Sequence, residues 1–465
     1  MVKCTQVPAR LKKNLQKKMA GKIKHASNKG KLLDMEIDYE CNYDTLLQQD
    51  WEAWNGVTLE SGDWIRVLPL QRCKPARCRV TVKAKSWTAN PPLIKVRPLV
   101  NCKWAPGRDF GRGLARAVNY LLLIWSKDLK IHVSLTTQSV KDWLCEVYNH
   151  FEEPWNMDWN CYDISDMFVK IPHADTMDAF KALHSHFKTD IYVIFDEEFK
   201  VIGHQKRRPN PVLTKFISFS DMTKILKMEL QMSAFMFGEV VVRQRLGHGM
   251  GKQSSPSLAS LTVFYLKFKA WIQNSPTLYS LSTSFMDDTL EACLNKSWMK
   301  EYYEPILRKS SMSLKHEGTR QANQIQFMQF LINCDSPFPD YQYKPREKLR
   351  YVQWSPIYGP RYFTTLVMST LCTLELFSSN FDNFRKSLVD YLTIWIQRQW
   401  PYRLVKQGMV WYLKSRHTGI MKDWLPVFLQ LWKTVMTSQR VVEIQDNKLI
   451  AYYTQSGPTN NSRSE

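Results

Sequence analysis

The chain has 465 residues, of which 44% are hydrophobic and 13% aromatic, which is ample for the cores of two or three packed subdomains. Lys and Arg outnumber Asp and Glu by 64 to 43, and the resulting net charge of +21 indicates a polyanionic partner such as nucleic acid. Apolar runs such as LLLIW at 121–125 fall far short of the roughly 20 residues that span a bilayer, so we expect no membrane-spanning segment.

The basic excess is concentrated at the start of the chain, where residues 1–33 carry ten Lys or Arg and no acid. This arm has three interpretations that the sequence leaves open: an extension that grips phosphates, an organelle-targeting presequence, or a solvated tail. The ten cysteines include no CxxC pair, which favours reduced thiols in an intracellular protein. We therefore expect an intracellular location, and the sequence does not choose between nucleus and mitochondrion.

After the arm, the stretch CRVTVKAKSW alternates as a strand does, with lysines on one face, and IKVRPLVNCKW follows at 94–104. Helical periodicity appears at about 112–125 and again at about 137–151. The segment at 161–187, CYDISDMFVKIPHADTMDAFKALHSHF, reads as a buried strand closed by Pro172 and then a helix. A hairpin over 190–204 and an amphipathic helix around 220–236 come next.

From residue 239 the pattern predicts a β-branched strand, a glycine-rich loop and a helix with Pro256 in its first turn. The following segment, LYSLSTSFMDDTLEACL, alternates on both sides of its two aspartates, which predicts a hairpin with Asp287 and Asp288 at the tip. Further on we expect a helix near 297–309 and a strand pair around SMSLKHEG and IQFMQFLIN. A helical, Trp-rich and basic region then runs from about 340 to 437.

Adjacent carboxylates repel, so Asp287 and Asp288 belong either to a solvated turn or to a site for divalent cations. Asp163 stands on an earlier strand, and the glycine-rich loop lies between the two segments. Three carboxylates on adjacent strands can hold two divalent ions about 4 Å apart, the arrangement used for in-line phosphoryl displacement. We therefore expect a site for two Mg²⁺ ions, with Mn²⁺ as a substitute, in which Asp163 and Asp287 contact both ions and Asp288 is the third ligand.

Three segments resemble, in order and spacing, the motifs of reverse transcriptases: DISDMF at 163–168, GHGMGKQSSPSLA at 247–259 and FMDD at 285–288. KVRPLV at 95–100 stands where that family keeps an arginine of the fingers subdomain. DISDMFVKIP, QRLGHGMGKQSSPSLASL and YKPREKLRYVQWSP are most similar to the Penelope-like group, which is related to telomerase. The chain departs from this group at Ser260, where Asn is usual, at Phe285–Met286, which replaces Tyr-Val, and in lacking a GIY-YIG nuclease.

The resemblance implies an α+β fold of the right-hand polymerase type, with fingers, a palm built on an antiparallel sheet and a helical thumb. The expected divisions are a basic arm at 1–35, an N-terminal region and fingers at 36–160, and a palm at 161–335 with a fingers insertion at about 190–240. A helical thumb at 340–440 and a C-terminal extension with a polar tail at 441–465 complete the chain.

The resemblance also implies roles for further residues. Lys315 would be the general acid beside the leaving pyrophosphate, or else a solvated lysine. Phe168 would be a steric gate against the 2′-hydroxyl of a ribonucleotide, or else a core residue of a buried strand. The remaining expected nucleotide-binding residues are Arg97, Gly251 and Ser255, and the expected template or primer contacts are Gly247, Gly249, Phe285, Lys344 and Arg346.

The implied function is reverse transcription, in which deoxynucleotides are added to a primer 3′ end on an RNA template by two-metal-ion catalysis. The implied partners are an RNA template, a DNA or RNA primer and dNTPs, and the sequence does not indicate an oligomeric state. One alternative is an RNA-dependent RNA polymerase, against which the aromatic residue at 168 and MDD in place of GDD argue. The other is a non-catalytic nucleic-acid-binding scaffold, which has no evident need for three mutually repelling acids.

Overall fold

The fold was determined as a computed structural model, which describes residues 35–38, 41–82, 96–237, 240–249, 251–275, 279–319, 323–345, 352–417 and 421–445. It divides into two compact units. Unit 1 comprises the described residues up to His150 together with Asn156–Thr319, and unit 2 comprises Phe151–Trp155 and the described residues from Arg320 onward. The expected basic arm up to residue 34, the tail from 446 and Arg346 lie outside the described residues.

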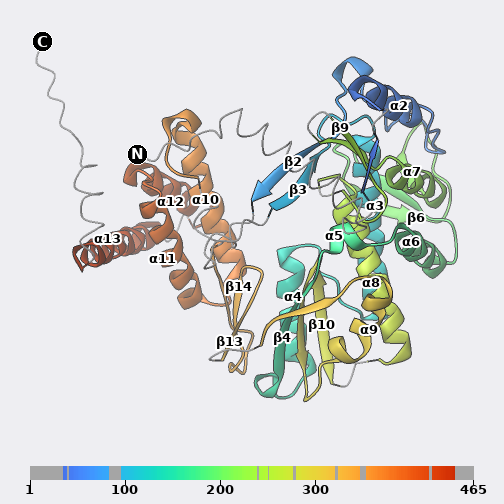
Figure 1. Cartoon of the computed structure of the whole chain (residues 1–465). Coiled ribbons are helices and arrows are strands. Elements are labelled where there is room, and N and C mark those ends of the chain that lie inside the picture. The colour runs from blue at the N-terminus through green and yellow to red at the C-terminus, as the bar shows by residue number, and fades with distance from the viewer. Residues whose placement is uncertain are drawn as a thin grey trace, which may run out of the picture. The chain divides into compact units, whose positions relative to one another are not determined.

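Unit 1 begins with a five-stranded sheet in the order β1-β9-β8-β2-β3 (Figure 1). Its strands are β1 (Met35–Asp38), β2 (Arg77–Val82), β3 (Val96–Asn101), β8 (Ala234–Phe237) and β9 (Val240–Gln244). Helix α2 (Tyr43–Asn55) packs on it through Leu46, which contacts Ala234 and Val241 in a small apolar cluster. Residues 78–82 of the alternating stretch CRVTVKAKSW therefore lie in a strand, and residues 96–100 of KVRPLV lie in its antiparallel neighbour, while residues 83–95 are outside the described part of the chain.

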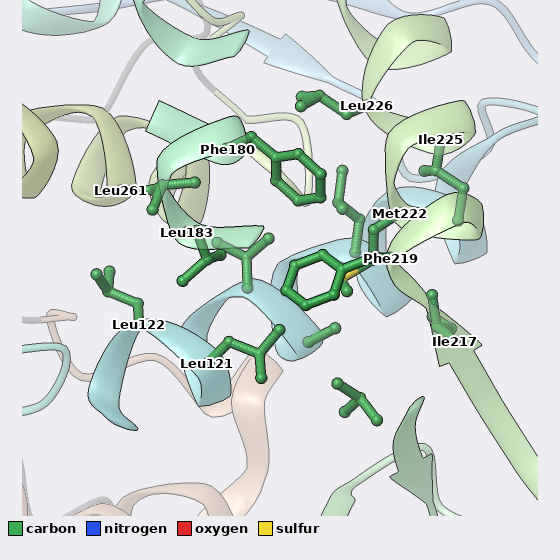
Figure 2. Close-up of a cluster of buried hydrophobic side chains, with 14 of the residues drawn as sticks. Leu121, Leu122, Phe180, Leu183, Ile217, Phe219, Met222, Ile225, Leu226 and Leu261 are labelled. Atoms are coloured by element: carbon green, nitrogen blue, oxygen red, sulfur yellow. The ribbon is translucent and has the colours of Figure 1, made fainter. Parts of the chain in front are cut away.

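The main core of unit 1 lies among helices (Figure 2). The helices of this core are α3 (Arg108–Leu129), α6 (His173–Phe187), α7 (Phe219–Gln231) and α8 (Ser255–Gln273), whereas α4 (Thr137–His150) contributes no residue to it. Leu121 and Leu122 of α3, Phe180 of α6, and Phe219 and Met222 of α7 pack together there. A three-stranded sheet of β5 (Tyr192–Phe195), β6 (Val201–Gln205) and β7 (Lys215–Ser218) adjoins this core in the order β6-β5-β7.

A four-stranded antiparallel sheet in the order β10-β11-β4-β12 carries the aspartates. Its strands are β4 (Asp158–Ile164), β10 (Ser280–Phe285), β11 (Asp288–Cys293) and β12 (Leu314–Thr319). Helix α8, the π-helix η4 (Met299–Tyr303) and α9 (Glu304–Lys309) pack with Tyr162 of the sheet in one apolar cluster. Trp159, which points to the other face, meets Trp143 of α4 edge-on with ring centroids 6.2 Å apart. Because both faces are packed, the register of the strands is fixed.

Unit 2 combines a small sheet with helices. The strands β13 (Gln324–Phe327), β14 (Phe330–Asn333) and β15 (Tyr341–Tyr343) are antiparallel, and the helices are α10 (Gly359–Phe377), α11 (Phe381–Gln397), α12 (Tyr402–Arg416) and α13 (Met421–Gln445). Phe363 of α10 packs edge-on against Trp400, which stacks on Trp395 of α11. Short helical turns lie at η1 (Leu70–Arg72), η3 (Pro154–Asn156) and η6 (Pro356–Tyr358).

The α+β class, with an antiparallel sheet under the aspartates and a helical C-terminal region, is confirmed. The helices predicted at 112–125 and 137–151, the hairpin at 190–204 and the two-aspartate hairpin are also present. Among the described residues, no helix combines the length and apolar character that crossing a lipid bilayer requires.

Three predicted elements differ from the structure. The strand expected to run to Pro172 ends at Ile164, because the backbone turns at Asp166 (φ 57°) into the short helix α5 (Met167–Lys170). The helix predicted over 220–236 ends at Gln231, and its last residues form β8 instead. The strands of SMSLKHEG and IQFMQFLIN do not pair with each other: β12 joins β4, and β13 joins β14.

The division between the units falls between Thr319 and Arg320. It lies inside the range 161–335 that we expected for the palm, because β13 and β14 pack with the helices of unit 2 rather than with the aspartate-bearing sheet. The subdomain limits predicted from the sequence stay predictions.

Candidate active site

One transverse row of the four-stranded sheet gathers four of the predicted site residues. Phe285 on β10 lies opposite Asp288 on β11, Asp288 lies opposite Asp163 on β4, and Asp163 lies opposite Lys315 on β12. Residues directly opposite each other project from the same face of a sheet, with Cα atoms roughly 4.5–5.5 Å apart. Asp163 therefore stands between a second carboxylate and a lysine.

Asp287 occupies the tip of the hairpin. The pair Phe285–Asp288 closes the ladder, so Met286 and Asp287 form a two-residue turn. The amide of Ile164 donates a hydrogen bond of 2.8 Å to the Asp287 carbonyl oxygen, which ties the tip to the end of β4. Met286 has a φ of 55°, in the left-handed region, where a non-glycine residue is strained by about 1–3 kcal/mol and is often found at functional sites.

The three aspartates match a divalent-cation site in donor type and in strand position. Carboxylate oxygens are the ligands that Mg²⁺ prefers, and all three side chains are partly exposed rather than buried in the core. Within the described ranges, however, no group of three or more His, Cys, Asp or Glu side chains is already arranged closely enough to hold a metal ion. Binding of ions by Asp163, Asp287 and Asp288 stays a prediction.

A buried carboxylate lies on the opposite face of the same hairpin. Glu291 of β11 is fully buried, and its carboxylate accepts hydrogen bonds from Ser280 Oγ at 2.9 Å, Ser297 Oγ at 2.6 Å and the Met299 amide at 3.1 Å. Burial raises the pKa of Glu291, and these hydrogen bonds oppose that shift. The network joins both strands of the hairpin to η4, so it fixes the base of the candidate site.

A buried lysine supports the hairpin from helix α8. The Lys267 side chain donates hydrogen bonds to the carbonyl oxygens of Ser282 on β10, at 2.8 Å, and His132, at 3.3 Å. Burial lowers the pKa of Lys267 to about 7, and the negative charge of Glu291 opposes that shift. A small cavity beside Lys267 is also lined by Ser284 and Met286 of the hairpin. Sequence reasoning missed Lys267, although a lysine inside the apolar run of α8 is a visible signal.

The glycine loop, residues 247–251, lies against the chain's own backbone. A Cβ at Gly247 would lie 2.3 Å from the Phe168 carbonyl oxygen, and one at Gly251 would lie 2.1 Å from that of Val100. The hydroxyl of Ser255 donates a hydrogen bond of 2.8 Å to the Gly249 carbonyl oxygen. Glycine is therefore required at 247 and 251 because the protein's own backbone occupies the space of a Cβ. The contacts of these two residues to nucleotide or template stay predictions.

Phe168 lies on α5, not on a buried strand as its alternative interpretation supposed. Its ring is partly buried and packs at the margin of the cluster formed by α8, η4 and α9. One side of the ring is thus held by the core, while part of it remains accessible to a ligand.

The predicted basic residues fall in different settings. The side chain of Lys315 is 64% exposed, and its Nζ lies 3.5 Å from Glu317 Oε1. An exposed ion pair of this kind contributes little to stability. Lys344 belongs to unit 2 and forms a 2.9 Å ion pair with Asp390. Arg97 lies on β3 opposite Thr81, but its side chain is outside what the structure describes, as is Arg346.

No protein family matches the chain, and no curated protein sequence matches it. Among solved structures, apo telomerase from Candida tropicalis is similar, with a TM-score of 0.45 and 14% identity over 83% of this chain and 68% of that one. Telomerase from Candida albicans, bound to a fragment of telomeric RNA, has a TM-score of 0.43 and 12% identity over 84% of this chain and 68% of that one. An insertion-loop deletion mutant of the RNA-dependent RNA polymerase of a human picobirnavirus has a TM-score of 0.48 and 12% identity over 92% of this chain and 88% of that one.

The likeness between this chain and these structures is distant. TM-scores below 0.5 and identities of 12–14% do not carry a function from one protein to another. We therefore base the functional proposal on the geometry of this chain.

Proposed function

We propose that this chain is an RNA-directed DNA polymerase of the reverse-transcriptase superfamily. The observation that carries the proposal is the register of the sheet, which brings Asp163 opposite Asp288 and fastens Asp287 to the end of β4. Adjacent acids at the tip of a strained hairpin are costly unless cations neutralise them, so their convergence favours a cation-dependent reaction over a scaffold role. The net charge of +21 favours a polyanionic substrate.

Asp163, Asp287 and Asp288 would hold two Mg²⁺ ions, for which Mn²⁺ could substitute. Bound there, the ions would activate the attacking 3′-hydroxyl and neutralise the charge of the triphosphate and the leaving pyrophosphate. Lys315, one strand from Asp163, is the proposed proton donor to the pyrophosphate. Phe168 is the proposed steric gate, and Arg97 the proposed triphosphate contact.

The first experiment is primer extension on an RNA template with dNTPs and Mg²⁺. We expect extension by the wild type, its loss on chelation of Mg²⁺, and a decrease of at least about 10³-fold for Asp288→Asn, because the substitution keeps the shape of the side chain but removes the ligand charge. Asp158→Asn is the matched control, since Asp158 is on the same strand as Asp163 but opposite Cys293 at its far end.

Two results would contradict the proposal. Full activity of Asp288→Asn would remove the metal-ligand assignment. A wild type that binds RNA but extends no primer with either dNTPs or rNTPs would identify a scaffold instead.

The second experiment separates a DNA product from an RNA product. The aromatic ring of Phe168 would collide with a 2′-hydroxyl, so we expect the wild type to prefer dNTPs and Phe168→Val to accept rNTPs about tenfold or more better relative to dNTPs. Competition between the two nucleotide classes at a single template position measures the ratio. A wild type that prefers rNTPs would instead favour the RNA-dependent RNA polymerase.

Several finer features belong to the same proposal. The Penelope-like grouping rests on sequence motifs alone. The N-terminal arm is proposed to capture nucleic acid or to direct the protein to the nucleus or the mitochondrion. The template and primer contacts proposed at Gly249, Phe285, Lys344 and Arg346 await crosslinking to a bound duplex.

A further inference from the structure

Helix α5, which carries Phe168, cannot fix its own position. It has four residues, fewer than a stable isolated helix needs, so contacts from outside decide where it lies. Met167 is buried in the core and anchors one side of the helix. On another side the helix meets the glycine loop.

The contact between the glycine loop and α5 is a pair of backbone hydrogen bonds. The Gly247 amide donates to the Ile171 carbonyl oxygen and the His248 amide donates to the Phe168 carbonyl oxygen, both at 2.7 Å. Gly247 has a φ of +75° and leaves no room for a Cβ, since that atom would lie 2.7 Å or less from backbone atoms of Phe168 and Val169. A shift of the loop therefore shifts the backbone that carries the Phe168 ring.

Two histidines hold the loop in this position. The His173 Nε2–H, at the start of α6, donates to the Gly247 carbonyl oxygen at 2.8 Å. The buried ring of His248 contacts the Thr176 hydroxyl at 3.0 Å. Burial lowers the pKa of His248 to about 3, so the ring stays neutral at neutral pH and brings no charge into the core.

The other end of the loop is tied to elements farther along unit 1. Gly251 has a φ of +109° and leaves no room for a Cβ, which would lie 2.1 Å from the Val100 carbonyl oxygen of β3. The ammonium of Lys252 donates to the carbonyl oxygens of Glu229, at 2.8 Å, and Met232, at 2.6 Å, at the C-terminal end of α7. Gly249 differs from Gly247 and Gly251 because a Cβ at Gly249 would meet its nearest neighbour, Gln244 Oε1, at an ordinary van der Waals distance of 3.7 Å. The described residues of the glycine loop, with Lys252 directly after it, are thus packed against β3 and hydrogen-bonded to α5 and to the end of α7.

We propose that Gly247 and His173 are positioning residues for the Phe168 ring, so that discrimination between deoxyribose and ribose is set by the glycine loop as well as by Phe168 itself. The inference rests on the proposed polymerase function. Its physical basis is that a misplacement of about 1 Å can cost about 10²-fold in rate, and a Cβ at Gly247 would lie 2.3 Å from the Phe168 carbonyl oxygen, well inside van der Waals contact, so one of the two segments must move.

The test compares two variants with two matched controls. Gly247→Ala forces the loop away from the Phe168 carbonyl, while Gly203→Ala adds the same methyl group on β6, where no atom lies within 4 Å of the new Cβ. His173→Phe removes the hydrogen bond to Gly247 but keeps a ring of similar size, and His184→Phe makes the same change on the same helix, at a side chain that is 46% exposed and lies beside Asp190.

Two quantities are measured for each variant: the ratio of rNTP to dNTP incorporation, and amide hydrogen exchange over residues 167–171. We expect Gly247→Ala and His173→Phe to raise the ratio about tenfold or more, with faster exchange in that segment and a smaller change in the rate with dNTPs. Gly203→Ala and His184→Phe should match the wild type in both measurements.

The outcomes separate the inference from the function on which it rests. A wild type that extends no primer overturns both. A wild type that discriminates, and loses discrimination in Phe168→Val but keeps it in Gly247→Ala and His173→Phe, overturns the positioning role alone. If Gly247→Ala does not fold, His173→Phe decides the question, because it places no new atom against the Phe168 backbone.

Discussion

Lys267 shows how a single buried residue couples stability to pH. Its side chain is 4% exposed, and its pKa is lowered from 10.5 to about 7 by burial. Between these two pH values the unfolded chain binds a proton at Lys267 that the folded chain does not bind. The folded state is therefore penalised fully below pH 7, and the penalty disappears as the pH rises toward 10.5.

We predict that the wild type gains stability relative to Lys267→Met as the pH rises from 7 to 10, because Met has no titrating group at this position. Denaturant midpoints of both proteins at pH 7, 8.5 and 10 measure the difference. Lys269→Met, at an exposed position of the same helix, should show no such trend. Parallel curves for wild type and Lys267→Met would show that the amine titrates alike in the folded and unfolded chains.

The crossing of α10 and α12 depends on a glycine inside a helix. A Cβ at Gly408 of α12 would lie 2.6 Å from Val367 Cβ and 2.9 Å from the Thr364 carbonyl oxygen of α10. Alanine is favoured over glycine in helices by about 1 kcal/mol, so propensity and packing oppose each other here. Because the Thr364 carbonyl is a backbone group and cannot move aside as a side chain can, we expect the cost of the clash to exceed the gain in helix propensity.

We predict that Gly408→Ala destabilises unit 2 by about 1–3 kcal/mol, the usual cost of overpacking. Gln407→Ala, its exposed neighbour, should be neutral or slightly stabilising. Val367→Gly removes the nearest clashing atom, so it should cost less stability in the double variant Gly408→Ala/Val367→Gly than it does alone if the clash is the cause. Denaturant unfolding of the full chain measures all four, and a stabilising Gly408→Ala would show that the helices separate without cost.

For the whole molecule, the net charge of +21 predicts the character of nucleic-acid binding. Each phosphate that a Lys or Arg neutralises releases counterions, so affinity falls with salt. If six to ten phosphates are contacted, affinity for a primer–template duplex should fall about 10³- to 10⁵-fold between 50 and 200 mM salt. Fluorescence polarisation with a labelled duplex measures the slope.

The Asp288→Asn variant is the control for this prediction, because its defect should lie in the chemical step and not in phosphate contacts. We expect it to bind the duplex with the wild-type salt slope while failing to extend the primer. An affinity independent of salt would contradict an electrostatic interface and would remove the charge as support for a nucleic-acid partner.

Much of the candidate site follows from local sequence pattern. Alternation around Asp287 and Asp288 specifies a hairpin, and the helix after Pro256 follows from its apolar spacing; both are present in the structure. Prediction was less successful where neighbours decide the conformation. The helix α5 after Asp166 is hydrogen-bonded to the glycine loop at Phe168, and the segment after Gln231 forms β8 because it pairs with β9; a local window contains neither partner.

The sequence by itself determined the net charge, the order of the motifs and the hairpin that carries two aspartates, because each depends on composition or on residues a few positions apart. Only the tertiary structure decided that Asp163 lies between Asp288 and Lys315, that Lys267 is buried, and that the Phe168 backbone leaves no room for a Cβ at Gly247. These features join segments far apart in the chain, and side-chain packing on both faces of the sheet selects their register.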